Sequence, residues 1–89
     1  MLTDVTPGLT VFVRRGCHLC TDMVQALERL RPELGFEYSQ VDIDQNPDLL
    51  RRYDTRVPVL VAGDTEICYY FLEEQRLRAH FQENSGSRE

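Results

Sequence analysis

Hydrophobic residues follow two different spacings along the chain, and their alternation predicts a series of strands and helices. Residues 9–14, LTVFVR, are rich in β-branched and aromatic side chains and predict a first strand. From Cys17 onward the apolar positions change to a helical spacing, which gives one apolar face to a helix. This apolar face contains Cys20, Met23, Val24, Leu27 and Leu30. Pro32 lies at the expected end of this helix, and Gly35 closes the segment.

The middle of the chain predicts a second strand and a second helix. The strand covers residues 36–44, FEYSQVDID, although its apolar alternation slips between Tyr38 and Val41. Either a β-bulge or burial of both faces would explain the slip. Asn46 suits the N-cap of the following helix because its side-chain oxygen can accept hydrogen bonds from backbone N–H groups, and Pro47 suits the first helical position.

The last third predicts a hairpin and a final helix. Residues 59–62, VLVA, read as a third strand, and residues 65–70 read as a fourth. Gly63-Asp64 between them suits a tight turn. The final helix is expected from about Glu73 to Phe81, with Leu77 and Phe81 on its buried side. Residues 83–89, ENSGSRE, are expected to be a flexible polar tail.

The predicted element order is therefore β-α-β-α-β-β-α. A helix joins the first two strands and is long enough for a crossover, so these strands are expected to be parallel, whereas the last two form an antiparallel hairpin. The predicted fold class is α/β, with a four-stranded mixed sheet and helices on both faces. A chain of 89 residues holds one domain, which we place at residues 1–82.

Composition and charge narrow the possible partners. The net charge is −5, and the ten basic residues are all arginine. The only adjacent basic pairs, Arg14-Arg15 and Arg51-Arg52, are too sparse to neutralise a row of phosphates, so no nucleic-acid partner is expected. No apolar run approaches the roughly 18 residues of a membrane span, and the segment MLTDVTPG lacks the features of a signal peptide. We therefore expect a cytoplasmic monomer without a membrane partner.

The pair Cys17 and Cys20 carries the main candidate chemistry. Cys17 lies where the first strand hands over to the first helix, and the free N–H groups and positive dipole end of that helix would stabilise its thiolate. Cys20, one turn later, is near enough to attack a mixed disulfide formed at Cys17. A Cys-x-x-Cys beside a β-α-β pattern is typical of a thioredoxin-like redox motif. His18, as imidazolium, would favour the thiolate further, whereas Asp22 would oppose it.

Other interpretations of the cysteines remain open. A structural zinc site needs four ligands, usually as two close pairs, but His18, Cys68 and His80 are scattered and form no second pair. Cys17 and Cys20 could also be structural, although Cys17 falls outside the apolar face. Three cysteines argue against a disulfide framework, and Cys68 on the fourth strand is expected to be a small buried hydrophobe. Tyr69, Tyr70 and Phe71 are expected to lie in the core and its rim.

Two motifs in this element order resemble a known family. VFVRRGCHLC after a strand, followed by RVPVLVAG before another, is similar to glutaredoxins within the thioredoxin fold, and most of all to short bacterial glutaredoxin-like proteins of unassigned role. The resemblance implies that Cys17 is the nucleophile and Cys20 the resolving thiol. It also implies that Pro58 is a cis-proline beside the dithiol and that the Val57 backbone binds a peptide or glutathione by β-augmentation.

The chain departs from that family in ways that bear on the substrate. His-Leu stands between the cysteines where typical dithiol glutaredoxins have Pro-Tyr. Cys68-Tyr69 occupy the place of the Gly-Gly whose amides meet a glutathione carboxylate. The cation three residues before the nucleophile is kept as Arg14, which could clamp a carboxylate. The fold assignment survives these changes, but glutathione becomes a doubtful co-substrate.

The expected function is thiol–disulfide oxidation and reduction by the Cys-His-Leu-Cys dithiol. The substrate would be a protein or small-molecule disulfide, and glutathione or a thioredoxin-reductase-type system would restore the thiols. No cofactor or metal is expected. The alternative is a non-catalytic module that docks a peptide at Val57-Pro58, or that ligates a metal or an iron–sulfur cluster.

Overall fold

The computed structural model describes residues 8–63 and 65–86, with side chains to residue 82, and its elements follow the predicted order. They are β1 (Leu9–Val13), α1 (His18–Leu34), β2 (Tyr38–Asp42), η1 (a 3-10 turn, Ile43–Gln45), α2 (Pro47–Tyr53), β3 (Val59–Ala62), β4 (Thr65–Tyr69) and α3 (Glu74–Gly86). Within the described residues, no helix combines the length and apolar character needed to cross a membrane.

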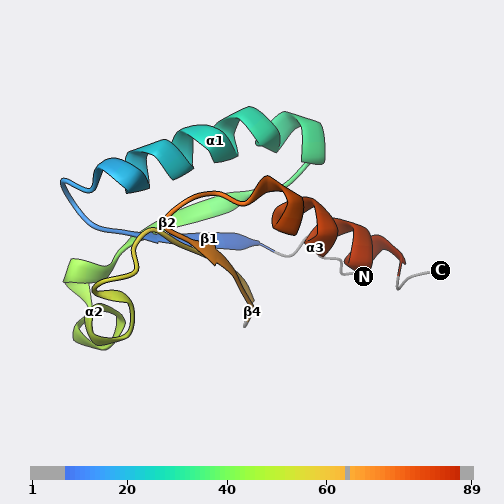
Figure 1. Ribbon diagram of the computed structural model, residues 1–89. Helices are drawn as coiled ribbons and strands as arrows, with labels where there is room; N and C mark the ends of the chain where they lie inside the picture. Colours follow the sequence, from blue (N-terminus) through green and yellow to red (C-terminus); the bar gives the residue numbers. More distant parts are fainter. Residues whose placement is uncertain (1–7, 64, 87–89) are drawn as a thin grey trace.

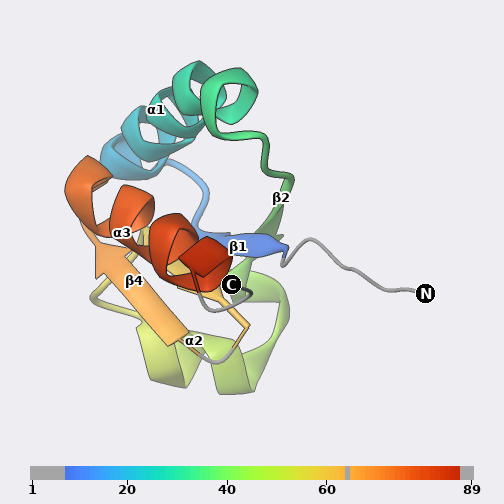
Figure 2. The same ribbon diagram turned by 90° about the vertical axis from the view of Figure 1, so that its right-hand side faces the viewer.

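The four strands form one mixed sheet in the order β2-β1-β3-β4. β1 and β2 are parallel, whereas β3 is antiparallel to both β1 and β4. Helices α1 and α3 lie over one face of this sheet and α2 lies against the other, as Figures 1 and 2 show from two directions. The predicted α/β fold class, the strand directions and the helices on both faces are therefore confirmed.

Each face of the sheet has its own hydrophobic cluster. The larger cluster joins β1, β3 and β4 to α1 and α3, with Val11, Leu27, Leu60 and Leu77 almost completely buried. The smaller cluster lies under α2 and contains Ile43, Tyr53, Val59 and Val61. Alternate residues of β3 belong to different clusters, which is why VLVA is apolar throughout.

The slip in the apolar pattern of residues 36–44 comes from burial on both faces. Phe36 and Tyr38 pack into the cluster under α1, whereas Ile43 belongs to the cluster under α2. The pairing of β2 with β1 continues through five residues without a register shift. Of the two explanations, burial on both faces is therefore the one the structure supports.

Several predicted boundaries differ from the observed ones. α1 includes Pro32 and ends two residues later, where Gly35 caps it with a left-handed backbone (φ 72°) and donates its N–H to the Arg31 carbonyl over 2.8 Å. α3 extends beyond Phe81 to Gly86, so residues 83–86 of the predicted tail belong to the helix. Asp64 of the predicted turn and residues 87–89 of the tail lie outside the described residues.

Candidate active site

A tight turn connects β1 to α1 and places Cys17 at the helix start. The Cys17 N–H donates to the Arg14 carbonyl over 3.3 Å, which closes a four-residue turn. Gly16, the third residue of this turn, has φ 74°, a conformation that glycine adopts without a steric penalty. The backbone of Cys17 is extended (φ −90°, ψ 110°), as is usual for an N-cap residue.

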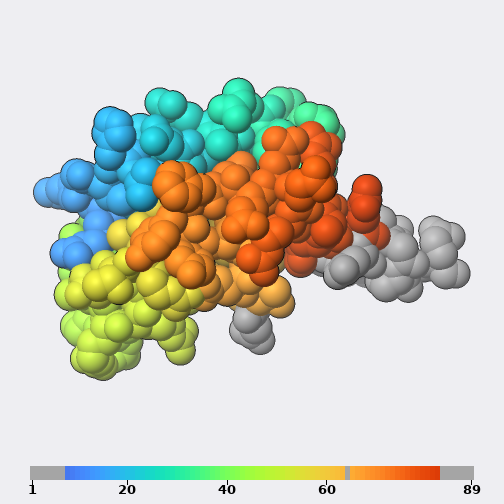
Figure 3. Space-filling model, viewed as in Figure 1, coloured from blue at the N-terminus to red at the C-terminus, as the bar shows by residue number. Residues whose placement is uncertain are grey.

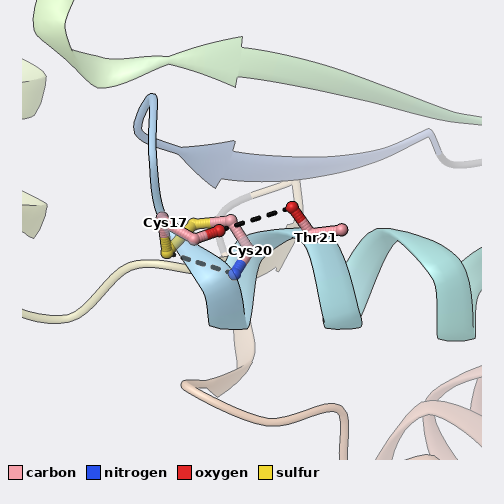
Figure 4. Close-up of a disulfide and its surroundings, with 3 residues drawn as sticks. All are labelled: Cys17, Cys20 and Thr21. Carbon is pink, nitrogen blue, oxygen red and sulfur yellow. Dashed lines mark hydrogen bonds between the residues drawn. A yellow bond between two sulfur atoms is a disulfide. The ribbon is translucent and has the colours of Figure 1, made fainter.

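The Cys17 sulfur takes the place of an N-cap oxygen. Its Sγ accepts the N–H of Cys20 over 3.1 Å and is also joined to the Cys20 sulfur in a disulfide, with the two Cα atoms 5.2 Å apart (Figure 4). The Cys17 carbonyl accepts the Thr21 N–H over 3.2 Å, which starts the helical ladder. When the disulfide is reduced, this backbone donor and the helix dipole would stabilise negative charge on Cys17.

The two cysteine residues differ in how far they are buried. The Cys20 residue is only 4% exposed and belongs to the buried face of α1 together with Met23, Leu27 and Leu30. Cys17 is half-buried, on the turn outside that face. The predicted shielding of Cys20 relative to Cys17 is therefore confirmed at the level of whole residues.

A pocket of about 430 Å³ opens beside the disulfide, between the first turns of α1 and the edge strand β2. Both cysteines, His18, Gln25 and Gln40 contribute to its lining. The sequence patterns did not indicate Gln25 or Gln40 as site residues, because the approach of β2 to α1 is a tertiary feature.

The loop before β3 carries the cis peptide bond that the family resemblance implied. The Val57–Pro58 bond is cis, with Pro58 buried and Val57 half-buried. Because Phe12 pairs with Val59, this loop lies at the end of β1 from which the Cys17 turn departs. Within the described residues, the backbone N–H and C=O of Val57 have no backbone hydrogen-bond partner, so they are free to pair with an extended chain.

Arg14, expected to be available for a ligand carboxylate, is engaged by two carboxylates of its own chain. Its Nη1 contacts Asp54 Oδ1 at 2.7 Å and its Nη2 contacts Asp44 Oδ1 at 3.0 Å. Asp54 follows α2 and leads into the cis-proline loop, so Arg14 ties the cysteine turn to that loop. A ligand carboxylate would have to displace one of these pairs. The sequence analysis did not identify Asp44 and Asp54 as partners.

Comparison with known proteins agrees with this geometry. The family model of the glutaredoxin-like domain (DUF836) matches residues 8–82. The chain belongs to the glutaredoxin-like domain family. A protein of this size in Nitrosomonas europaea, Ne2328, has a solution structure with 42% sequence identity and a TM-score of 0.77, covering 90% of this chain and 98% of that one.

Two further relatives widen the comparison. The uncharacterised protein Rv0508 of Mycobacterium tuberculosis is 33% identical over 78 residues, which cover 82% of this chain and 80% of the relative. The glutaredoxin-like protein NrdH-redoxin of Escherichia coli shares the fold, with a TM-score of 0.53 at 22% identity over 82% of this chain and 95% of that one. The fold is therefore thioredoxin-like, of glutaredoxin type.

This glutaredoxin-like chain differs from typical dithiol glutaredoxins at the end of β4. Cys68, in the place of the first expected glycine, is 1% exposed, and burial raises the pKa of its thiol. Its predicted place in the core is confirmed. Tyr69, in the place of the second glycine, is 45% exposed. Tyr70, which the sequence did not single out as a site residue, adopts the left-handed backbone (φ 68°) that suits glycine best.

The remaining candidate residues of this glutaredoxin-like site can also be placed. His18 is exposed at the first position of α1 and lines the pocket beside the disulfide, and its influence on Cys17 stays a prediction. Among the described residues, no group of three or more His, Cys, Asp or Glu side chains is arranged to hold a metal ion. The site thus combines a disulfide-bonded cysteine pair at a helix start with a cis-proline loop at the same end of the sheet.

Proposed function

We propose that this protein is a thiol–disulfide oxidoreductase that works through Cys17 and Cys20. The observation that carries the proposal is the position of the Cys17 sulfur, which accepts a helix N-terminal N–H and lies within bonding distance of the Cys20 sulfur. A thiolate held by such a donor is the attacking species in thiol–disulfide exchange. Membership of the glutaredoxin-like family supports the same chemistry.

The proposed reaction transfers two electrons from the dithiol to a substrate disulfide. The Cys17 thiolate attacks one sulfur of the substrate, forms a mixed disulfide and releases the other sulfur as a thiolate. Cys20 then loses its proton and attacks the Cys17 sulfur, which releases the second substrate thiolate and closes the Cys17–Cys20 disulfide. The shielded position of Cys20 suits the role of resolving thiol. The sulfur that it attacks belongs to Cys17, one helical turn away, so Cys20 does not need to reach a partner in solution.

The proposed reaction needs a reductant that restores the dithiol after each turnover. A separate reductant, either glutathione or a thioredoxin-reductase-type system, would return the Cys17–Cys20 disulfide to the dithiol. The reaction requires no metal or organic cofactor because the electrons reside on the two sulfurs. We propose a cytoplasmic monomer without nucleic-acid or membrane partners.

Glutathione itself is expected to be a poor substrate. The bulky Tyr69, in the place of a glycine, would crowd the backbone amides that receive a glutathione carboxylate, and Arg14 is already paired with Asp44 and Asp54. In a glutathione-coupled disulfide assay we expect at most weak turnover compared with an ordinary dithiol glutaredoxin. Comparable turnover would mean that the Val57 backbone and a displaced Arg14 suffice for binding.

The proposal is tested by trapping the mixed disulfide. With Cys20→Ser, reduced protein mixed with a small aromatic disulfide should accumulate a stable adduct at Cys17, detected by mass spectrometry. Cys17→Ser should form no adduct, and Cys68→Ala should cycle like the unaltered protein. The oxidoreductase function is wrong if two results are found together. The Cys20→Ser protein forms no adduct, and in the reduced unaltered protein Cys17 and Cys20 react equally fast with an alkylating reagent. The non-catalytic docking module would then be the better assignment.

A further inference from the structure

Three consecutive aromatic residues at the end of β4 are exposed, although positions in the core and its rim were expected for them. Tyr69, Tyr70 and Phe71 are 45%, 39% and 63% exposed, and they are the exposed large hydrophobic residues of the described chain. A contiguous group of exposed apolar side chains indicates a surface that contacts another molecule. Such side chains would stabilise the fold more if they were buried in the core. We call residues 69–71 the aromatic platform.

The aromatic platform is fixed to the cis-proline loop. The Tyr70 N–H donates to the Pro58 carbonyl over 2.9 Å, and the Tyr70 hydroxyl donates to the Thr55 carbonyl over 2.7 Å. The Tyr69 and Tyr70 rings meet edge to face with centroids 4.9 Å apart. These contacts hold Tyr70 in a left-handed backbone conformation (φ 68°) that a residue with a side chain adopts only at a cost in free energy. The rings are therefore presented in a defined arrangement.

The platform lies at the same end of the sheet as the dithiol. Tyr69 pairs with Val59, and Val59 pairs with Phe12, so the end of β4, the start of β3 and the end of β1 form one row. Figure 3 shows the orange surface of this part of the chain next to the light-blue start of α1 and the yellow loop before β3. A chain bound along Val57 would thus run beside the aromatic rings.

The platform is closely followed by an acidic residue, and the exposed Arg76 beyond it lines a separate pocket beside the start of β4. Arg56, which lies over the Tyr69 ring at 5.0 Å, is already paired with Glu66. Glu73, two residues after Phe71, is exposed and forms no ion pair within the described residues. The whole chain carries a net charge of −5. A ligand that carries a positively charged group beside an apolar group would therefore be complementary to the platform and Glu73.

We propose that the aromatic platform selects protein disulfides whose cysteine is flanked by a bulky apolar residue and then by a basic residue. The apolar side chain would pack on Tyr69 and Phe71 while the peptide backbone pairs with Val57, and the basic group would lie near Glu73. This inference rests on the proposed oxidoreductase function and names the class of its substrate as an extended protein segment.

The experiment compares three mixed disulfides of thionitrobenzoate, whose release is followed by absorbance. One carries a short peptide with Phe and Arg beside its cysteine, the second the same peptide with Ser and Gln there, and the third 2-mercaptoethanol. In each reaction the Cys17 thiolate of reduced Cys20→Ser protein bonds to the peptide or mercaptoethanol sulfur, and thionitrobenzoate leaves with the electron pair. We expect the Phe-Arg peptide to react about tenfold faster than the Ser-Gln peptide.

Matched variants assign the preference to the platform. Tyr69→Thr with Phe71→Ser should reduce the tenfold ratio to about two, the part that Glu73 still contributes, with each peptide rate normalised to the mercaptoethanol rate of the same variant. Tyr38→Ser, which removes an aromatic ring from the opposite edge strand, should keep the ratio. Glu73→Gln should lower the rate for the Phe-Arg peptide about twofold, because a surface charge pair contributes little. Circular dichroism confirms that each variant folds.

The outcomes separate this inference from the proposed function. If none of the three disulfides reacts, the oxidoreductase function fails and the platform assignment fails with it. If all three react but the two peptides react equally, the function stands and the platform is not a selector. A tenfold ratio that survives in the Tyr69→Thr, Phe71→Ser protein would also overturn the inference.

Discussion

The chain holds cysteine in two contrasting environments. Cys17 lies at the N-terminus of α1, half-buried, with a backbone N–H directed at its sulfur and a second sulfur bonded to it. Cys68 lies on the edge strand β4, is 1% exposed and packs in the cluster beneath α1 and α3. Burial raises the pKa of the Cys68 thiol, so this cysteine is harder to ionise than a thiol in water.

The difference shows that position in the fold, rather than residue type, decides the chemistry of a thiol. A helix N-terminus supplies unpaired N–H groups and a positive dipole end, both of which favour a thiolate. A strand interior supplies only apolar neighbours, in which a thiolate would lose its hydration. One cysteine is therefore suited to exchange disulfides and the other to fill a small space in the core.

The largest expected effect is on alkylation. In fully reduced protein at neutral pH, iodoacetamide should modify Cys17 at least about a hundredfold faster than Cys68, because a buried thiol reacts only when the structure opens locally. Cys20 should react at an intermediate or slow rate because its sulfur faces the core. Peptide mapping by mass spectrometry over time gives the three rates. Fast modification of Cys68 would break the contrast and make it a third redox thiol.

Substitution by serine should affect stability differently at the two positions. Cys68→Ser places a hydroxyl in an apolar cluster and should lower the free energy of unfolding by about 1–3 kcal/mol. Cys17→Ser, compared with reduced protein, should change it by less than about 0.5 kcal/mol, since serine is a favourable N-cap. Urea unfolding under reducing conditions measures both. Equal losses at the two sites would mean that Cys17 is as tightly packed as Cys68.

Stability should also depend on pH through Cys68. Because its folded-state pKa is raised by burial, the unfolded thiol ionises first, and the protein should lose stability as the pH rises above about 8.5. Below that pH the Cys68 thiol is protonated in both the folded and the unfolded protein, so the free energy of unfolding no longer changes with pH through this group. Between pH 8.5 and 9.5 the loss is at most about 1.4 kcal/mol. Urea unfolding of Cys17→Ser, Cys20→Ser protein with and without Cys68→Ala isolates this effect, which Cys68→Ala should remove.

The smallest expected effect concerns His18. If its imidazolium stabilises the Cys17 thiolate, His18→Ala should move the thiolate titration, followed by ultraviolet absorbance, to higher pH by no more than about one unit. The Cys17–Cys20 disulfide should then become less oxidising. An unchanged titration would assign the stabilisation to the helix N-terminus alone, and His80→Ala, on α3, serves as the matched control.

Much of the fold follows from short stretches of sequence. The helical spacing from Cys20 to Leu30 and the cap at Asn46 each depend on residues within a few positions of one another, and the structure contains both. The same holds for Cys17, whose place between a strand and a helix already indicated an activated thiol. The cis form of Pro58 was implied by the family resemblance, because local physics indicates only that a proline at a strand start has a positional reason.

Other features required the tertiary structure. Arg14 meets Asp54 across 40 positions of sequence, a pairing that depends on the order in which the strands assemble. The exposure of residues 69–71 depends equally on the packing of neighbouring elements, since the apolar pattern alone placed them in the core and its rim. Spacing and capping act within one or two helical turns, whereas charge pairing and surface exposure are properties of segments that meet only after folding. The sequence by itself therefore located the candidate reactive cysteine, and the tertiary structure decided what surrounds it.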